Sequence, residues 1–200
     1  MRQSAMRAAH VLALGLWFGG AAFFNFVTAP TIFEAFKQVV HGGPSDRTAY
    51  QPITTADATK KQKDALAGAL AGAAVGPVFP KYFATQAGCG VVALATALAW
   101  RNAGGRVHRL RVYVIGLAVL TVAAAWPVSD AVTALRLRRF DPDAAVADAA
   151  TAAFAAWHLA SLLLSFVTVA LAGVALAMAA RLPVPENDRT EPATADPPSW

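Results

Sequence analysis

Long apolar segments constrain this chain more than any other feature of its sequence. The clearest one follows Lys81 and contains no charged residue before Arg101. A transmembrane helix needs about 20 mostly apolar residues to cross the hydrocarbon core of a bilayer. The sequence therefore predicts a membrane span here, and three other segments have the same character. The predicted spans are residues 8–29, 81–100, 112–130 and 151–180.

The composition agrees with an integral membrane protein. Hydrophobic residues make up 56% of the chain and charged residues 14%, whereas a soluble domain has about 25% charged residues. The net charge is +5, but the Lys and Arg residues gather at the ends of the apolar segments, where lipid headgroups lie. We therefore expect membrane lipids as partners and no nucleic acid, since no basic stripe with interleaved aromatic residues is present.

These segments predict an all-α fold, a polytopic membrane domain (residues 1–181) built as a four-transmembrane-helix bundle. Residues 30–64 are predicted to form a polar connection, with an amphipathic turn or two at 32–40. A tail, residues 182–200, is rich in Pro and acidic residues. Such a segment buries too little apolar surface to fold, so the tail is predicted to be disordered.

Residues 65–79 are apolar but too short to cross a bilayer. They predict a short interfacial helix before the second span. The alternative is that they join the second span in one long helix kinked at Pro77 and Pro80. A second alternative concerns the first span, which could be a signal peptide cleaved after Ala29. Its apolar run is longer than a signal core of 7–15 residues, which favours an uncleaved helix.

Four spans put both chain ends on one side of the membrane, here called side A; the opposite side is side B. Lys and Arg residues are almost equally numerous on the two sides. The loop 101–111 contains four arginines and no acid, which favours side A as cytoplasmic, while Arg136, Arg138 and Arg139 argue for side B. We expect a multi-pass protein of the bacterial inner membrane with cytoplasmic termini.

Polar residues inside the predicted spans are the candidate site residues, because polar groups in a membrane are costly and often functional. Five of them, from four helices, fall at one depth near side B. We predict that they line a small polar ligand-binding pocket. Each also has a purely structural interpretation, such as an interhelical hydrogen bond, an interfacial anchor or a solvated helix end. The five residues are Asn25, Tyr82, Gln86, Asp130 and His158.

Several chemistries find little support in the sequence. His158 and Asp130 are the candidate metal ligands, but they supply at most two donors. His10 and His158 lie at opposite sides, which disfavours a haem shared between them. The single cysteine, Cys89, excludes an intramolecular disulfide and a CxxC motif. No catalytic or nucleotide-binding fingerprint is present, so we expect a non-enzymatic protein without a cofactor.

Small residues on two helices indicate possible contacts with other helices. Gly15 and Gly19 share one face of the first span, and Gly68 and Gly72 are four residues apart in the next apolar segment. Small residues at this spacing allow close helix packing in membranes. A homo- or hetero-oligomer through these faces is therefore expected.

The order of several motifs resembles the transmembrane protein 205-like family, whose members carry the domain of unknown function DUF4149. The motifs are His10, Trp17-Phe18-Gly19-Gly20, Ala29-Pro30 and Phe79-Pro80-Lys81-Tyr82. The resemblance implies a four-span membrane protein with an uncleaved first helix. A weaker likeness is to the copper-resistance protein D type, whose spans also carry a His and a tryptophan-glycine-glycine motif.

Three functions follow as hypotheses. The first is a non-enzymatic membrane protein that binds a small ligand or lipid headgroup at the side-B polar residues. The second is a copper-type metal-handling or transport protein that uses His158 and Asp130. The third is a structural or assembly factor that acts through the glycine faces.

Overall fold

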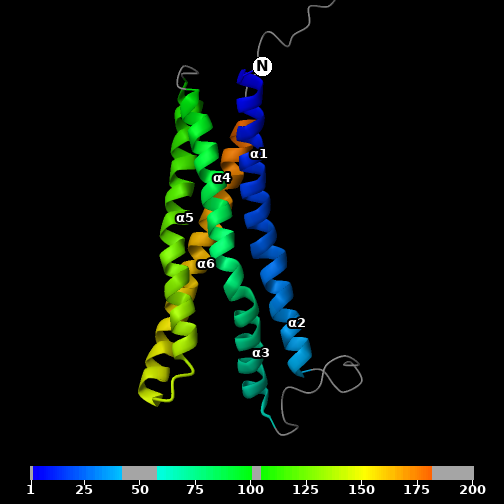
Figure 1. Ribbon diagram of the computed structural model, residues 1–200, viewed down its shortest axis with the longest axis vertical. Helices are drawn as coiled ribbons and strands as arrows, with labels where there is room; N and C mark the ends of the chain where they lie inside the picture. Colours follow the sequence, from blue (N-terminus) through cyan, green and yellow to red (C-terminus); the bar gives the residue numbers. More distant parts are fainter. Residues whose placement is uncertain (1, 42–57, 101–104, 182–200) are drawn as a thin grey trace, which may run out of the picture.

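The structure is a computed structural model that describes residues 2–41, 58–100 and 105–181 (Figure 1). It confirms the all-α fold and contains, in this part of the chain, four helical units that are long and apolar enough to cross a membrane. The elements are α1 (Arg2–Phe23), the π-helical turn η1 (Phe24–Thr28), α2 (Ala29–His41), α3 (Lys60–Val75), the 3-10 turn η3 (Gly76–Val78), α4 (Phe79–Ala99), α5 (Arg106–Arg138) and α6 (Ala144–Ala180). The predicted tail 182–200 lies outside the described residues.

The helical units are longer than the predicted spans. The first runs from Ser4 to His41 without interruption, and the second from Lys60 to Ala99. At 1.5 Å per residue, units of 33 to 40 residues measure about 50–60 Å. The hydrocarbon core is only about 30 Å thick, so each unit extends well beyond it.

The first helix does not end at Pro30, although residues 30–64 were predicted to be a polar connection. Proline has no N–H group, and its ring clashes with the carbonyl group four residues earlier in a regular α-helix. The π turn Phe24–Thr28 comes just before it, and the N–H of Ala29 bonds to the carbonyl of Phe24, five residues back. This wider turn accommodates the proline, and the helix continues as α2 to His41.

Helix α3 precedes α4, and the two belong to one continuous helical unit. Thr59 begins α3 with a capping box to Gln62. The 3-10 turn η3 joins α3 to α4, and both prolines of this junction, Pro77 and Pro80, stand at the first or second position of an element. Proline is tolerated there, because N–H groups at those positions have no partner within the helix.

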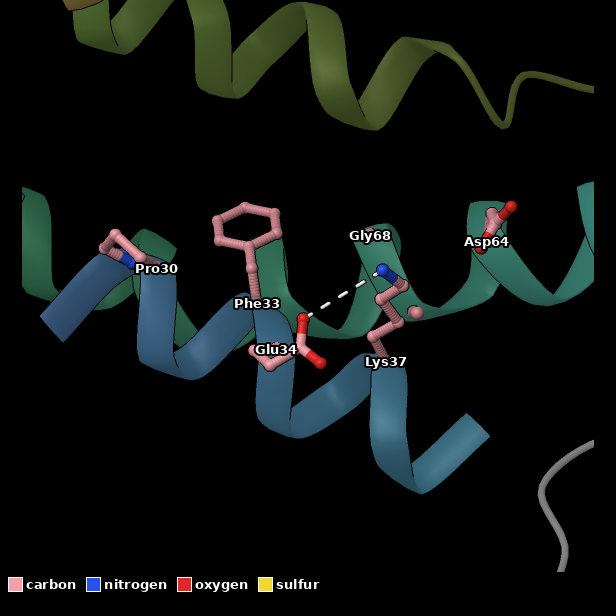
Figure 2. Close-up of a pocket in the computed structure, with 7 residues that line it drawn as sticks. Pro30, Phe33, Glu34, Lys37, Asp64 and Gly68 are labelled. Carbon is pink, nitrogen blue, oxygen red and sulfur yellow. Dashed lines mark ion pairs between the residues drawn. The ribbon is translucent and has the colours of Figure 1, made fainter. Parts of the chain in front are cut away.

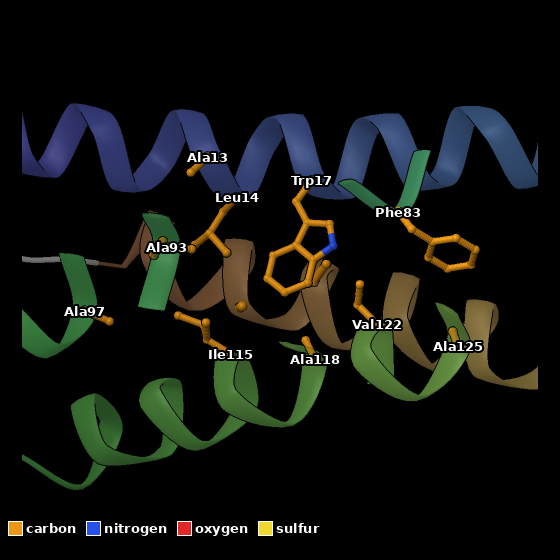
Figure 3. Packing of buried hydrophobic residues seen from close by; sticks show 13 residues of the cluster. Ala13, Leu14, Trp17, Phe83, Ala93, Ala97, Ile115, Ala118, Val122 and Ala125 are labelled. Atoms are coloured by element: carbon orange, nitrogen blue, oxygen red, sulfur yellow. The ribbon is translucent and has the colours of Figure 1, made fainter. Parts of the chain in front are cut away.

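A compact core holds α1, α4, α5 and α6 together. Trp17 and Leu14 point from α1 into the space between the other helices (Figure 3). Most of their partners are alanines, and such small residues let membrane helices approach closely. Gly90 of α4 is required by this packing, because a Cβ atom at this position would lie 2.9 Å from both the Trp17 ring and Val119.

Toward side B the bundle divides into two helix pairs, which diverge in Figure 1. One pair is α2 with α3, and the other is the end of α5 with the beginning of α6; the partners within each pair pack on each other. A contact of 2.8 Å between His41 Nε2 and Asp64 Oδ1 joins the outer ends of α2 and α3. Asp143 caps α6 by accepting a hydrogen bond from the N–H of Ala145 at 2.9 Å.

We predict that Gly90→Leu destabilises the bundle, because the added side chain has to displace Trp17 or Val119. Overpacking of this kind costs about 1–3 kcal/mol. The thermal midpoint in detergent measures the effect. Gly88→Leu is the matched control, since nothing lies within 4 Å of a Cβ atom at Gly88. Equal midpoints for the two variants would contradict this account of the core.

Candidate functional site

A cavity of about 680 Å³ lies between the two diverging helix pairs; we call it the side-B cleft. Cavities that bind small molecules measure about 300–1,000 Å³ and combine apolar walls with a few polar groups. The aromatic part of its wall consists of Phe24, Phe33, Phe79, Phe83, Phe140, Phe154 and Phe166. Its polar and charged lining residues are Asn25, Asp64, Tyr82, Ser129, Arg136, Arg139, Thr151, His158, Ser161 and Ser165.

A hydrogen-bonded group connects three helices at the inner end of the cleft. Asn25, in the π turn, donates from Nδ2 to the Tyr82 hydroxyl at 3.0 Å and to the Ala21 carbonyl at 2.8 Å. Its Oδ1 accepts a hydrogen bond of 2.9 Å from Ser165 of α6. The π turn therefore holds Asn25 where α1, α4 and α6 meet, and π turns occur often at functional sites.

Three of the five predicted site residues line the cleft: Asn25, Tyr82 and His158. Gln86 lies behind the cleft wall, with only 4% of its surface exposed. Its Oε1 accepts a hydrogen bond of 3.2 Å from Trp17 Nε1, so Gln86 connects the core to the polar group of the cleft. Gln86 itself is not among the residues that line the cavity.

Asp130 is not among the residues that line the cleft. It is exposed on α5, while its neighbour Ser129 is buried and lines the cavity. Successive residues of an α-helix are rotated by 100°, since 3.6 residues make one turn. The predicted depth of Asp130 therefore did not determine the direction of its side chain.

Arg136 was not among the predicted site residues, and it is the residue that connects the two helix pairs. Its guanidinium group donates from Nη1 to the Gly72 carbonyl of α3. A Cβ atom at Gly76 would lie 2.7 Å from Arg136 Nη2, and one at Gly72 would lie 3.0 Å from Nη1. These two glycines therefore leave the space that the arginine occupies. In the sequence, the spacing of Gly72 and Gly76 was the signal that a large side chain could pack against α3.

Arg139, at the end of α5, lies beside an aromatic stack. Its Cζ is 4.8 Å from the centre of the Phe154 ring. Phe154 in turn stacks on the imidazole of His158, with the ring centres 5.4 Å apart and the planes 8° from parallel. The Nε of Arg139 is buried and has no hydrogen-bond partner among the described residues.

The positive charges of the cleft are not neutralised by nearby acids. Within the described residues, neither Arg136 nor Arg139 has a carboxylate within ion-pair distance. The acidic lining residue, Asp64, is paired with His41. The cleft is thus an aromatic cavity with two guanidinium groups that have no carboxylate partner in the described part of the chain.

A smaller pocket of about 310 Å³ lies beside the outer end of the cleft, between α2 and α3 (Figure 2). It shares Pro30, Phe33, Asp64 and Gly68 with the cleft. Lys37 and Glu34 form an exposed ion pair of 4.0 Å at its edge. Exposed pairs of this kind contribute little stability. Because the two pockets share four lining residues, the smaller one is the outer margin of the cleft.

A second polar cluster lies near the beginning of α5, at the opposite end of the bundle. His10 is fully buried; its Nδ1 lies 3.1 Å from the Ala93 carbonyl and 2.8 Å from Thr96 Oγ1. Its ring meets Trp100 edge-on at 5.0 Å, and the guanidinium of the buried Arg111 lies 5.2 Å from the centre of the same indole. Arg111 also donates to His108 Nδ1 at 2.8 Å. These contacts fasten α1 to α4 and α5.

The candidate metal ligands do not form a group of donors. His158 stacks on Phe154, and Asp130 is exposed on α5. Residues 2–41, 58–100 and 105–181 contain no cluster of three or more His, Cys, Asp or Glu side chains that could hold a metal ion.

We predict that Asn25→Leu lowers the free energy of unfolding by about 1–2 kcal/mol, because it removes hydrogen bonds to two neighbouring helices. Interhelical hydrogen bonds in membranes contribute about 0.6 kcal/mol on average and at most about 1.7. Unfolding by denaturant in mixed micelles measures the change. Thr85→Leu is the control, since the Thr85 hydroxyl bonds only to the carbonyl of Lys81 in its own helix. A loss no larger than that of the control would refute the role of Asn25.

Comparisons with known proteins bear on one continuous part of this architecture. Residues 58–141 match the model of a family described as a domain of unknown function, DUF4149. Neither the comparison with curated proteins nor that with solved structures gives a match. The matched region contains α3, α4 and α5, and with them Tyr82, Arg136 and the glycines that contact it. Residues 58–141 thus have the character of a DUF4149-type domain.

Proposed function

We propose that this chain is a non-enzymatic integral membrane protein that binds a lipid-like amphiphile in the side-B cleft. The observation that carries the proposal is the combination, in one cavity, of a polar group at the inner end with an aromatic wall. Asn25, Tyr82 and Ser165 provide the polar group. An amphiphile has one polar and one apolar part, and this cavity offers a surface for each.

The depth of the cleft supports a ligand from the bilayer. Tyr82 and Trp100 are 18 residues apart on α4, which corresponds to about 27 Å along a helix. This length is close to the thickness of the hydrocarbon core, about 30 Å. With Trp100 at one interface, where tryptophan is enriched, Tyr82 falls near the other. Tyr82, at the inner end of the cleft, then lies close to the level of the lipid headgroups.

The divergence of the helix pairs offers a route from the bilayer. Phe26 and Phe166, with ring centres 5.7 Å apart, connect the first helical unit to α6. Beyond this contact α2 and α6 diverge (Figure 1), and Phe33 and Leu162 line the cavity from the two sides. A lipid could therefore enter sideways without first leaving the membrane.

The family motifs fit the same proposal. Trp17 of the tryptophan-phenylalanine-glycine-glycine motif bonds to Gln86, and Tyr82 of the phenylalanine-proline-lysine-tyrosine motif bonds to Asn25. We therefore propose that the chain is a transmembrane protein 205-like member of the DUF4149 type. From the acid-free arginine loop we also propose cytoplasmic termini and a bacterial inner membrane.

A filled cleft tests the proposed function. Gly68 lines the cleft, and nothing lies within 4 Å of a Cβ atom built there, so Gly68→Phe adds a large ring at the cavity wall with an unobstructed Cβ position. We expect at least a tenfold loss of bound lipid, measured by native mass spectrometry of the full chain in detergent. Gly88→Phe, which is outside the cleft and equally unobstructed, should bind lipid as the parent does. Equal binding by both variants, or no bound lipid in the parent, would overturn the proposal.

The exposed glycines of α1 favour a second candidate, an assembly factor. Nothing lies within 4 Å of Cβ atoms built at Gly15 and Gly19, whereas Gly72 is covered by Arg136 of the same chain. The α1 face could therefore receive another helix. Cross-linking in native membranes tests it: a dimer or hetero-complex that disappears with Gly19→Leu supports this candidate, and a monomer throughout speaks against it.

A further inference from the structure

We propose that Arg136 and Arg139 make the side-B cleft selective for phospholipids of net negative charge, with the lipid phosphate bound by the two guanidinium groups. This inference rests on the proposed function and adds the class of ligand. It assigns a binding role to two residues that would otherwise belong only to a charged connection between helices.

Arg136 and Arg139 have no carboxylate partner among the residues that the structure describes. Both arginines are partly buried and line the cavity, yet no carboxylate lies within ion-pair distance of either in the described part of the chain. A charged group withdrawn from water is costly unless it is paired. A phosphate group in the cleft would supply the missing negative charge.

The two arginine side chains are placed so that both can contact one phosphate group. They are three residues apart, which brings residues of a helix to the same side. Each guanidinium has five N–H donors in a planar fork that matches the oxygens of a phosphate. Arg136 uses a donor of Nη1 on Gly72, while Arg139 lies against the face of Phe154 and leaves its buried Nε without a partner. Donors therefore remain free on both groups.

The acidic residues nearby are already engaged. Asp64 is paired with His41. Asp141 and Asp143, which follow α5, accept hydrogen bonds from the N–H groups of Asp143 and Ala145 at 3.0 and 2.9 Å. Among the described residues, the acids nearest the cleft therefore contact groups other than the two arginines.

The wall of the cleft favours a lipid over a free anion. Inorganic phosphate would use the arginines but leave the aromatic surface of Phe33, Phe79 and Phe166 empty. A phospholipid covers both surfaces at once, because its phosphate can bind the arginines while its apolar part contacts the aromatic wall.

The experiment compares two lipids that have the same acyl chains. The full chain is purified in an uncharged detergent, and binding of phosphatidylglycerol and phosphatidylcholine is measured by native mass spectrometry. We expect at least tenfold tighter binding of phosphatidylglycerol. The double variant R136Q/R139Q should lose this preference and keep its affinity for phosphatidylcholine. R139Q alone should weaken the preference while leaving the contact between Arg136 and Gly72 intact, so a folding defect at that contact can be recognised.

Arg106 and Arg109 provide the matched control, because they are also three residues apart on α5, exposed, and at the opposite end of the helix. R106Q/R109Q should retain the lipid preference. If it loses the preference equally, the effect is one of general charge and the inference is wrong. Displacement of the lipid by millimolar inorganic phosphate would also overturn it, in favour of a simple anion site.

The outcomes separate this inference from the proposed function. Equal binding of the two lipids, with both lost in Gly68→Phe, would refute the arginine selectivity and leave the lipid site standing. Absence of bound lipid in every case would refute both.

Discussion

Backbone hydrogen bonding around proline is the constraint on which the side-B half of this protein depends. A helix in a membrane must satisfy its N–H and carbonyl groups internally, and proline prevents the regular pattern. The first helical unit solves this with a π turn before Pro30, and the second with a 3-10 turn that contains Pro77. The two irregular turns lie side by side. The ring centre of Phe24 is 5.7 Å from that of Phe79 and 4.4 Å from that of Tyr82. Changes of this kind bend helices, and beyond this level α2 and α3 leave α5 and α6.

The same junction creates the candidate site. The π turn directs Asn25 toward Tyr82 and Ser165, and the divergence of the helices opens the cavity next to them. Arg136 reaches across the opening to the backbone of α3, where Gly72 and Gly76 leave room for its side chain. A single irregularity in each of two helices thus gives the cleft its polar inner end and its width, and α5 supplies its positive charge.

Much of this fold followed from the sequence, because apolar segment length and helix direction are one-dimensional properties. They predicted four membrane-spanning helices, and they placed Asn25, Tyr82 and His158 near side B, where all three line the cleft. They did not give the rotation of each helix, so Asp130 was expected in the pocket although it is exposed on α5. Gln86 was at the predicted level but proved to be buried against Trp17.

The arginines were missed for a different reason. Pro30 and the charged residues after Asp130 looked like the ends of helices, so the segments beyond them were assigned to connections. The helices in fact continue to His41 and Arg138, which brings Arg136 opposite α3. Only the three-dimensional packing of two segments 64 residues apart reveals that contact.

A crystal structure of the full chain grown from a lipidic mesophase would test the central claim most directly, since it reports both the helix arrangement and any ordered lipid. The account predicts that α2 and α3 diverge from α5 and α6 beyond the Asn25–Tyr82 contact, with elongated lipid density in the cleft and its phosphate at Arg136 and Arg139. A structure in which the two helix pairs pack directly against each other, with no space between them, would contradict it.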